Sequence, residues 1–431
     1  MRWDKSLRLD FRFQNANVVL TSQTPVGIIP PPSDPLEWLD GYTGYYVRLT
    51  DDDGRVFYVQ TLRDPFRSEA ETYGDDESSP LDYAILKEPE VEFSILVPDP
   101  GFTFTLEIVN NPLQPEIPVY RLARQSFTFT IDPAELIFPP MVVSREVEHG
   151  AVLGVEKLVD HGPDDKCWTI CILAEGYRAD EMPKFVSDAA GFIDRFKSFG
   201  PFDEFWHRTN VYIVKVSSTD SGADLPAQCQ DGAPPVSVNT YFNASFCGAV
   251  GNKRLLVVDQ QTAKKVWDNF APQAHVTFAM VNSPIYGGSG GNVPVFSTNG
   301  SAALIGLHEL GHSFFKLADE YETPYINDNP DNYPNLTSRT QLADIKWKDL
   351  IAPGTPIPTS RNACAGDPFA HPVPDGTVGL FEGGLYQTCN VFRPEKNCLM
   401  RTLTKPGFCA VCTRVIRTKL SLLLGPDTLN V

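Results

Sequence analysis

The sequence predicts an α+β protein of two domains, an antiparallel β-sandwich over residues 1–140 followed by an α/β domain over residues 141–431. Two observations carry this prediction. Apolar and polar residues alternate with a period of two through the first third of the chain, as in strands with one buried face. After a proline-rich boundary at residues 132–150, apolar runs alternate with segments of helical periodicity, which is typical of a twisted mixed sheet with helices packed on it.

The strands of the first domain are expected where Leu, Phe and Ile alternate with polar residues, at residues 7–13, 102–108 and 127–131. Residues 45–62 indicate a hairpin, because Asp53-Gly54 favours a tight turn between paired strands. Several such strands separated by proline and glycine clusters are typical of a sandwich. Nothing in this part indicates catalysis, so we expect an accessory domain, with contact to a glycan or a protein as its candidate role.

The second domain begins with an apolar run at residues 167–176, which suits a strand buried on both faces. A helix should follow over residues 179–199, with Asp180 as its N-cap. Its apolar stripe is formed by Val186, Ala189, Ile193 and Phe196. Further strands are expected at residues 210–216, 254–259 and 275–281, and a helix at residues 261–270.

Charge and hydropathy exclude some partners. The formal net charge of −18 disfavours binding to nucleic acid or to an anionic membrane, since both require a basic surface. No apolar run approaches the roughly 18 residues of a transmembrane helix. The first thirty residues also lack the apolar core of a signal peptide.

The segment HELGH carries the chemistry of the second domain. His308 and His312 are four residues apart, so in a helix both imidazoles lie on one face and can bind one zinc ion. Glu309 points to the flank of that face, where it can take a proton from a zinc-bound water and pass it to the leaving amine. The pattern predicts a zinc site that activates water to cut a peptide bond, and the alternative is a buried helix with two hydrogen-bonded histidines.

The third protein ligand of this zinc is harder to locate. Asp319 lies eleven residues after His308, which returns it to within about 20° of the same helix face. It is also seven residues past His312, roughly 10 Å further along an unbroken helix axis. The chain must therefore turn between His312 and Asp319 if Asp319 is a ligand. Glu320 and an acidic residue from elsewhere are the alternatives.

Several further segments carry a resemblance to a known family. Besides HELGHSFFKLADEY, they are ILAEGYRADEMPKFVSDAAGFIDRF, VSSTDSGAD, YGGSGG, FEGGLYQTCNVFRPEKNCLM and FCAVC. In this order, the chain resembles the IgA peptidase-type zinc metallopeptidases, relatives of the metzincins. The resemblance spans about residues 158–412 and implies a zincin-type fold for the α/β domain, with HELGH on its active-site helix.

The resemblance implies a role for each matching residue. His308, His312 and Asp319 would bind the zinc, and Glu309 would be the general base. Met400 would form an apolar floor beneath the histidines, and Tyr386 would stabilise the oxyanion as a second catalytic group. The chain departs from related motifs in one respect, because residues 314–316 contain no glycine where the chain should turn.

The nine cysteines bear on both metal content and localisation. Cys167 and Cys171 are too far apart in a strand to bridge each other. We expect disulfides between Cys229 and Cys247 and between Cys364 and Cys389. Near the C-terminus, two outcomes remain open. The set Cys389, Cys398, Cys409 and Cys412 would form either a structural zinc site or further disulfides, and we favour disulfides. The resemblance favours an extracellular or cell-envelope location, with the cytoplasm as the alternative.

The glycine-rich segment at residues 286–296 is expected to border the active-site cleft and to pair with an extended substrate. Together with the resemblance, these features predict a zinc-dependent endopeptidase, and two other functions remain as alternatives. One is a secreted glycan- or protein-binding module on a zincin scaffold with little turnover. The other is an aminopeptidase, which would need an acidic group to bind the free amine of its substrate.

Overall fold

The computed structural model describes residues 3–39, 42–66, 68–72, 82–86, 90–111, 125–139, 149–229, 234–247, 252–322, 329–363, 368–404 and 407–426. The fold is α+β, with five α-helices and several β-sheets among these residues. No helix in the described part of the chain is long and apolar enough to cross a lipid bilayer.

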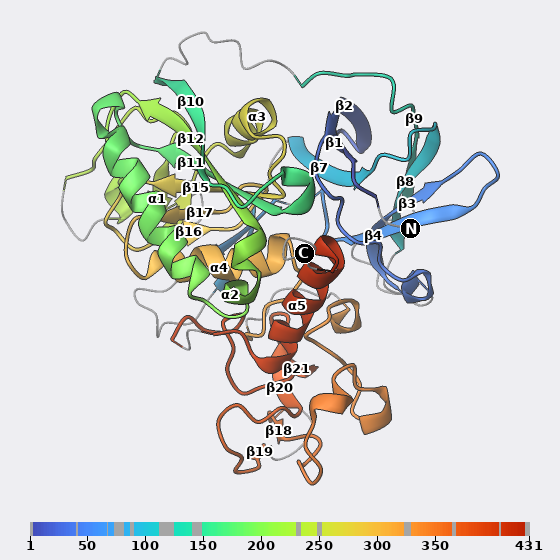
Figure 1. Ribbon diagram of the computed structural model, residues 1–431. Coiled ribbons are helices and arrows are strands. Elements are labelled where there is room, and N and C mark those ends of the chain that lie inside the picture. Colours follow the sequence, from blue (N-terminus) through green and yellow to red (C-terminus); the bar gives the residue numbers. More distant parts are fainter. Residues whose placement is uncertain are drawn as a thin grey trace.

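Two antiparallel sheets form the N-terminal region, at the right of Figure 1. The first has the order β2-β1-β7 and consists of Asn17–Val26, Ser6–Gln14 and Glu90–Pro98. The second has the order β4-β3-β8-β9 and consists of Val56–Leu62, Gly44–Thr50, Phe104–Asn111 and Gln125–Ile131. A hairpin of β5 (Ser68–Thr72) and β6 (Asp82–Leu86) belongs to the same part of the sequence, and β5 contacts Asn252–Val257 (β14) and Gly288–Ser289 (β16) of the second region. Side chains of both larger sheets share one hydrophobic cluster.

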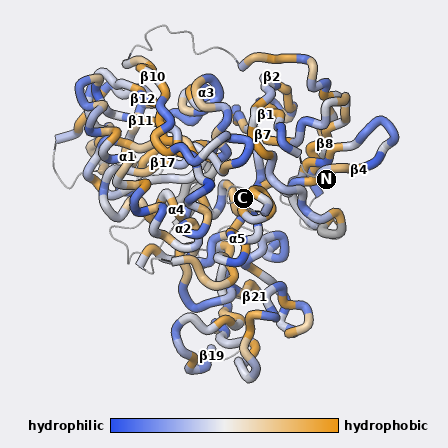
Figure 2. Tube along the Cα trace, viewed as in Figure 1, coloured by the Kyte–Doolittle hydropathy of each residue, from blue (hydrophilic) through white to orange (hydrophobic). Residues whose placement is uncertain are grey.

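The predicted hairpin is confirmed, since β3 and β4 pair in antiparallel fashion around Gly54. Figure 2 shows this turn as a hydrophilic tip. The alternation through β8 and β9 is also confirmed, but Phe102 lies before β8 and is 45% exposed. The prediction that Phe102 shares the buried face is wrong because the strand begins only at Phe104.

Strand β1 differs from the half-buried strand that its alternation predicts. Its polar residues Arg8 and Asp10 are buried together with its apolar residues. Arg8 Nη2 donates to the carbonyl oxygen of Ala274 at 2.6 Å, and Asp10 Oδ1 accepts from Lys264 Nζ at 2.6 Å. The polar face of β1 therefore packs against the following region of the chain, and charged partners there make its burial tolerable.

An eight-stranded mixed sheet is the centre of the second region, in the order β10-β12-β11-β15-β17-β16-β14-β13. In chain order its strands are Gly150–Val159 (β10), Trp168–Glu175 (β11), Thr209–Ser218 (β12), Ser245–Cys247 (β13), Asn252–Val257 (β14), Val276–Val281 (β15), Gly288–Ser289 (β16) and Val295–Ser297 (β17). Strand β11 is parallel to β12 and β15 and buried along its whole length, as predicted.

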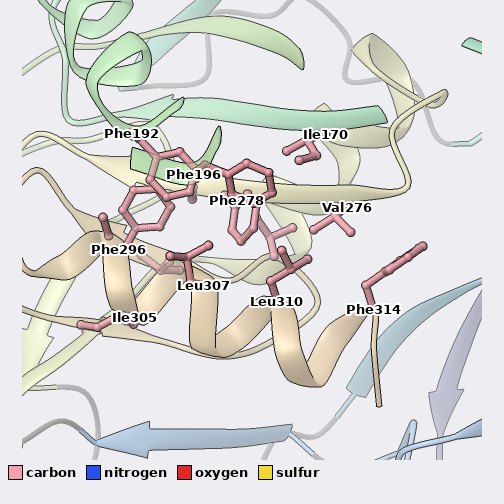
Figure 3. Packing of buried hydrophobic residues seen from close by; sticks show 14 of the residues in the cluster. Ile170, Phe192, Phe196, Val276, Phe278, Phe296, Ile305, Leu307, Leu310 and Phe314 are labelled. Atoms are coloured by element: carbon pink, nitrogen blue, oxygen red, sulfur yellow. The ribbon is translucent and has the colours of Figure 1, made fainter. Parts of the chain in front are cut away.

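The α-helices are α1 (Met182–Lys197), α2 (Phe202–Phe205), α3 (Gln260–Phe270), α4 (Ala302–Ser313) and α5 (Ala410–Leu424). Short 3-10 turns occupy Leu36–Leu39, Asp164–Lys166, Ala179–Glu181, Trp206–Arg208, Ala227–Cys229, Pro330–Asn332, Leu342–Asp344 and Lys348–Leu350. Leu307 and Leu310 of α4 point toward the aromatic side chains between the sheet and α1 (Figure 3). Helix α4 is buried from Ala302 to His312, so its position against the sheet is tightly constrained.

Helix α1 begins differently from the prediction. Asp180 lies in the 3-10 turn before the helix, where its carboxylate pairs with Arg178. Glu181 is the N-cap residue of α1, and its side chain accepts the Arg178 backbone N–H at 2.9 Å. The predicted N-cap at Asp180 is therefore wrong by one residue, because the reciprocal bond between Arg178 and Glu181 closes the turn. The apolar stripe buries Ala189, Ile193 and Phe196 as expected.

The segment after α4 forms the lower part of Figure 1. It contains a small sheet, in the order β19-β18-β20-β21, of Phe369–Ala370, Ser360–Arg361, Phe381–Gly384 and Gln387–Arg393. Helix α5 then returns beside the second region (Figure 1). The predicted disulfide between Cys229 and Cys247 is present, and Cys167 and Cys171 are free and buried. Cys364 lies outside the described residues, so its predicted pairing with Cys389 stays a prediction.

Candidate metal centre

Helix α4 brings its two histidines together from consecutive turns. His308 Nε2 and His312 Nε2 are 3.0 Å apart. Asp319 Oδ1 lies 3.2 Å from the first of these atoms and 3.1 Å from the second. The three side chains are 0%, 4% and 1% exposed. The structure thus gathers all three sequence-predicted ligands at one buried point, where they could hold a metal ion.

The hydrogen bonds of the two imidazoles identify which nitrogen faces this point. His308 Nδ1 bonds the carbonyl oxygen of Leu399 at 2.9 Å, and His312 Nδ1 bonds that of Leu317 at 2.7 Å. A carbonyl only accepts, so each Nδ1 carries the proton and each neutral ring directs a lone pair from Nε2. Asp319 Oδ1 has no hydrogen-bond partner in the described part of the chain.

Three acceptor atoms this close together repel one another unless a cation lies among them. Zn–N bonds of about 2.0–2.1 Å place tetrahedral ligand atoms about 3.3 Å apart, near the observed separations. The carbonyls on Nδ1 are the outer-shell partners that ligating histidines usually have. The donor set of two imidazoles and one carboxylate therefore fits a zinc ion with one coordination position left open.

The same neighbours set the ionisation of Asp319. Burial of this carboxyl disfavours its charged form. When His312 is protonated, its charge and the hydrogen bonds that protonated imidazoles donate outweigh burial, and the pKa of Asp319 lies well below its usual range. A cation held at the same point would act on Asp319 in the same direction. Asp319 is consequently a carboxylate, the form that binds a metal.

The chain turns sharply between His312 and Asp319, which confirms the turn predicted there. Helix α4 ends at Ser313, and Lys316 has a φ of 59°, in the left-handed region that glycine usually occupies. Two bonds close the turn. Lys316 N–H donates to the His312 carbonyl at 3.3 Å, and Leu317 N–H donates to the Gly311 carbonyl at 2.9 Å. A lysine thus adopts the conformation that the missing glycine would have favoured.

Met400 packs under α4 at a position where the helix has no side chain. A Cβ atom on Gly311 would lie 2.6 Å from Met400 Sδ, so a larger residue there would push the methionine side chain away from the helix. Met400 is fully buried, and its carbonyl accepts the Glu320 backbone N–H at 2.7 Å. The preceding residue, Leu399, supplies the carbonyl that orients His308. The segment that the resemblance implies as a floor therefore contacts both the helix and the ligand loop.

Glu309 borders a cavity of about 560 Å³ together with His312, Ser313 and Lys316. Residues 90–96 of β7, in the N-terminal region, also line this cavity. A Cβ atom on Gly290 would lie 2.6 Å from Glu309 Oε2, so the glycine-rich segment passes directly against this carboxylate. The prediction that this segment borders the cleft agrees with that position.

Tyr386 lies against the third ligand. Its hydroxyl donates to Asp319 Oδ2 and accepts a bond of 3.3 Å from Arg63 Nη2. Tyr386 is buried and has a φ of 63°. Sequence analysis missed Arg63, which comes from the N-terminal region 323 residues away from Tyr386. No motif marks Arg63, so only the packing of the two regions reveals it.

A second group of potential ligands corrects the expectation for the C-terminal cysteines. Cys398, Cys409 and Cys412 are free thiols, so the disulfides favoured for them are wrong. They gather with Glu320, and Cys389 is not part of the group. Glu320 follows Asp319 directly after the turn, and its Oε1 lies 3.4 Å from Cys412 Sγ at the start of α5. The three cysteines therefore gather around a carboxyl group and are not joined in pairs.

Two buried histidines, an aspartate and a neighbouring glutamate at a cavity are compatible with a metal-dependent hydrolase. Comparison with known families gives the narrower assignment. Residues 157–372 and 369–420 match the family described as IgA Peptidase M64, which is more than half of the chain, so the protein belongs to this family. It is therefore a peptidase, that is, a hydrolase that acts on proteins or peptides. A search of curated proteins found no match.

Proposed function

We propose that this protein is a zinc-dependent endopeptidase in which His308, His312 and Asp319 hold the metal and Glu309 is the general base. The observation that carries the proposal is the convergence of two Nε2 atoms and one carboxylate oxygen within 3.2 Å, while both Nδ1 atoms bond backbone carbonyls. When bound, zinc acts as a Lewis acid that makes water acidic and polarises the scissile carbonyl.

The residues of the chain supply the remaining steps. Glu309 takes a proton from the attacking water and then donates it to the amine that leaves. Its contact with Gly290 limits the directions in which its carboxylate can turn. Tyr386 is our candidate for stabilising the oxyanion, since its hydroxyl lies beside Asp319 at the edge of the centre.

The cavity supports an endopeptidase in preference to an aminopeptidase. An aminopeptidase requires an unpaired acidic group for the substrate amine. Besides Glu309, the cavity wall contains Glu90, Glu92 and Asp64. Glu90 and Glu92 pair with Arg12, at 3.0 and 2.8 Å, and Asp64 accepts the Phe66 backbone N–H at 3.0 Å. An extended substrate segment would instead run past Gly290 and β7.

The layout and the location of the protein are part of the proposal. We place the domain division at residues 1–140 and 141–431, supported by the separate hydrophobic clusters of the two regions. An extracellular or cell-envelope location is supported by the Cys229–Cys247 disulfide, because such bonds persist in oxidising compartments.

The test is cleavage of a peptide library with blocked N-termini by the wild type and by Glu309→Gln. Loss of the base should reduce kcat/KM by about 10²–10⁴-fold, while zinc content stays that of the wild type. Glu156→Gln, on the exposed face of β10, is the matched control and should retain full activity. Equal cleavage by Glu309→Gln and wild type would refute the mechanism, and cleavage only of unblocked peptides would indicate an aminopeptidase.

A further inference from the structure

Four buried side chains from three segments meet on the far side of the Asp319–Glu320 peptide. They are Glu320, Cys398, Cys409 and Cys412, the last two from the N-terminal end of α5. Their potential ligand atoms all lie within 4.8 Å of one another. The candidate catalytic centre does not use any of them. We propose that these four residues form a second, structural zinc site, and we call it the thiolate site.

The distances within the group suit a tetrahedral ion. Cys412 Sγ lies 3.4 Å and Cys409 Sγ lies 4.0 Å from Glu320 Oε1. Zn–S bonds of about 2.3 Å and Zn–O bonds of about 2.0–2.2 Å place neighbouring ligand atoms roughly 3.5–3.8 Å apart. The observed separations lie on both sides of this value, so small side-chain movements would complete the tetrahedron.

The ligand chemistry selects zinc and a structural role. Three soft thiolates favour zinc over calcium or magnesium, which take oxygen ligands. Four protein ligands leave no open position for water or substrate, which is the mark of a structural site. All four side chains are buried.

Backbone groups around the sulfur atoms favour thiolates. The Cys409 N–H donates to Cys398 Sγ at 3.2 Å, and the Cys412 N–H donates to Cys409 Sγ at 3.4 Å. Cys409 is also the N-cap residue of α5, where the positive end of the helix dipole stabilises an anionic sulfur. The N–H groups thus supply an outer shell of donors for a metal-bound thiolate cluster.

Glu320 gives independent support, because only one oxygen of its buried carboxyl group is hydrogen-bonded in the described part of the chain. Its Oε1 accepts a hydrogen bond from Asn335 Nδ2 at 3.0 Å. Its Oε2 is buried without a hydrogen-bond partner in the described part of the chain. Asn335 also bonds the N–H and the carbonyl of Ala318, so the loop that carries both Asp319 and Glu320 is fixed in place. A cation at the thiolate site would satisfy Glu320.

A disulfide explains the group less well. A Cys409–Cys412 bond would use two of the sulfur atoms. It would leave Cys398 without a covalent partner and Glu320 Oε2 without a hydrogen-bond partner in the described part of the chain. A redox role for the CAVC segment requires access for a partner thiol, and these cysteines are at most 2% exposed. A bound metal would also keep three thiols reduced in an oxidising compartment.

The thiolate site would act on catalysis by positioning the ligand loop and the floor of the first centre. Cys398 is followed by Leu399, whose carbonyl orients His308, and by Met400, which packs on Gly311. Glu320 is joined directly to Asp319. A metal that holds Cys398 and Glu320 therefore fixes the segments on both sides of the histidines. None of its ligands touches the reacting atoms.

The experiment is metal analysis of the full-length protein combined with cobalt substitution. We expect about two zinc ions per chain in the wild type and about one in His308→Ala/His312→Ala. Cobalt bound to that double variant should give an intense near-ultraviolet thiolate-to-cobalt charge-transfer band. Cys398→Ser should lose this band and about one metal, whereas Cys167→Ser, a buried free thiol outside both groups, should keep both.

The cobalt spectrum of the wild type gives an answer even if a variant fails to fold, since the charge-transfer band reports sulfur ligands directly. The proposal would be overturned by a wild type that binds cobalt without this band. A Cys409–Cys412 disulfide in the freshly purified protein would also overturn it. Neither result depends on peptidase activity, so failure of the thiolate site and failure of the proposed function are distinguishable.

Discussion

The two groups of candidate ligands differ in chemistry although a single peptide bond joins them. The group of His308, His312 and Asp319 has three nitrogen and oxygen donors beside a cavity. The thiolate site has three sulfur atoms and one carboxylate. With metal bound as we propose, the first would leave a coordination position for chemistry, and the second would fill every position. Under the two proposals, the residue pair Asp319-Glu320 divides one loop between a reactive centre and a supporting one.

Replacement of Asp319 should have the largest effect, because it should abolish peptide cleavage and leave the thiolate site intact. Asp319→Asn removes the negative charge that attracts the metal ion. The affinity for the metal should therefore fall by more than the roughly 10–100-fold typical of an outer-shell loss, and peptide cleavage should become undetectable. The charge-transfer band of the thiolate site should remain. The measurements are peptide cleavage and cobalt titration. Full activity with one metal missing would break the comparison.

Replacement of Cys398 should lower mainly the stability of the protein. Cys398→Ser should lower the free energy of unfolding by several kcal/mol, a large part of a typical total of about 5–15 kcal/mol, because metal binding contributes directly to folding. Thermal unfolding, followed with and without a chelator, checks this. The chelator should destabilise wild type and Cys167→Ser alike, and it should destabilise Cys398→Ser much less.

Tyr386→Phe tests whether the tyrosine acts in the reaction or only packs. A lost oxyanion donor typically costs about 10²–10³-fold in kcat. We expect a fall of this order with KM and zinc content unchanged. Arg63→Lys, which alters the other partner of the hydroxyl, is the companion variant and should have a smaller effect. A change confined to KM or to zinc content would leave Tyr386 as a residue that positions Asp319.

Acid should destabilise the protein through a histidine outside both metal sites. Burial lowers the pKa of His275 to about 4, against the hydrogen bond from its Nε2 to the Ile29 carbonyl, which favours the charged ring. The Thr169 N–H donates to His275 Nδ1, a bond that only the neutral ring can accept. Its folded pKa lies below the unfolded value, so its contribution is complete above about pH 6.5 and is lost as the pH falls toward 4. The contribution is roughly 3 kcal/mol.

Unfolding of chelator-treated protein at several pH values measures the His275 effect apart from metal loss. His275→Gln should flatten the dependence between pH 6.5 and 4, because glutamine has no ring nitrogen to protonate. An unchanged slope would assign the acid sensitivity to other groups. The difference between the pH dependence of wild-type stability with metal and that with chelator then reports on the two ligand groups.

Lys316→Gly should have the smallest effect. A non-glycine residue in the left-handed region costs about 1 kcal/mol, and the neighbouring Lys419 charge adds repulsion. Glycine should raise the free energy of unfolding by up to about 1 kcal/mol, with metal content unchanged. Lys316→Ala removes the charge but keeps the backbone strain, so it separates the two contributions. Destabilisation by glycine would mean that the lysine side chain itself supports the turn.

The sequence predicts much of the fold because its periodicities are local. The strand at Trp168–Glu175, the hairpin at Gly54 and the helix with HELGH follow from spacing within a few residues. The buried charge on β1 does not, since the carbonyl that Arg8 binds and the lysine that pairs with Asp10 lie more than 250 residues away.

The candidate site likewise has features that local spacing predicts and features that only the packing of distant segments determines. The spacing of HELGH is enough to pair His308 with His312, and helix geometry requires the turn before Asp319. Spacing alone could not choose between Asp319 and Glu320, and the structure directs them to different groups. Nor could spacing exclude Cys389, because membership of the thiolate site depends on how the small C-terminal sheet and α5 pack together.

The segment Cys398-Leu399-Met400 has a consequence for the order in which the protein is made. A ribosome completes HELGH and Asp319 about 80 residues before it reaches this segment. Until then the nascent chain lacks the carbonyl that orients His308, the side chain under Gly311 and three of the four ligands of the thiolate site. We therefore expect that a chain shortened before Cys398 carries the whole zinc motif and does not cleave peptides. Synthesis of the C-terminus would act as the final step of activation.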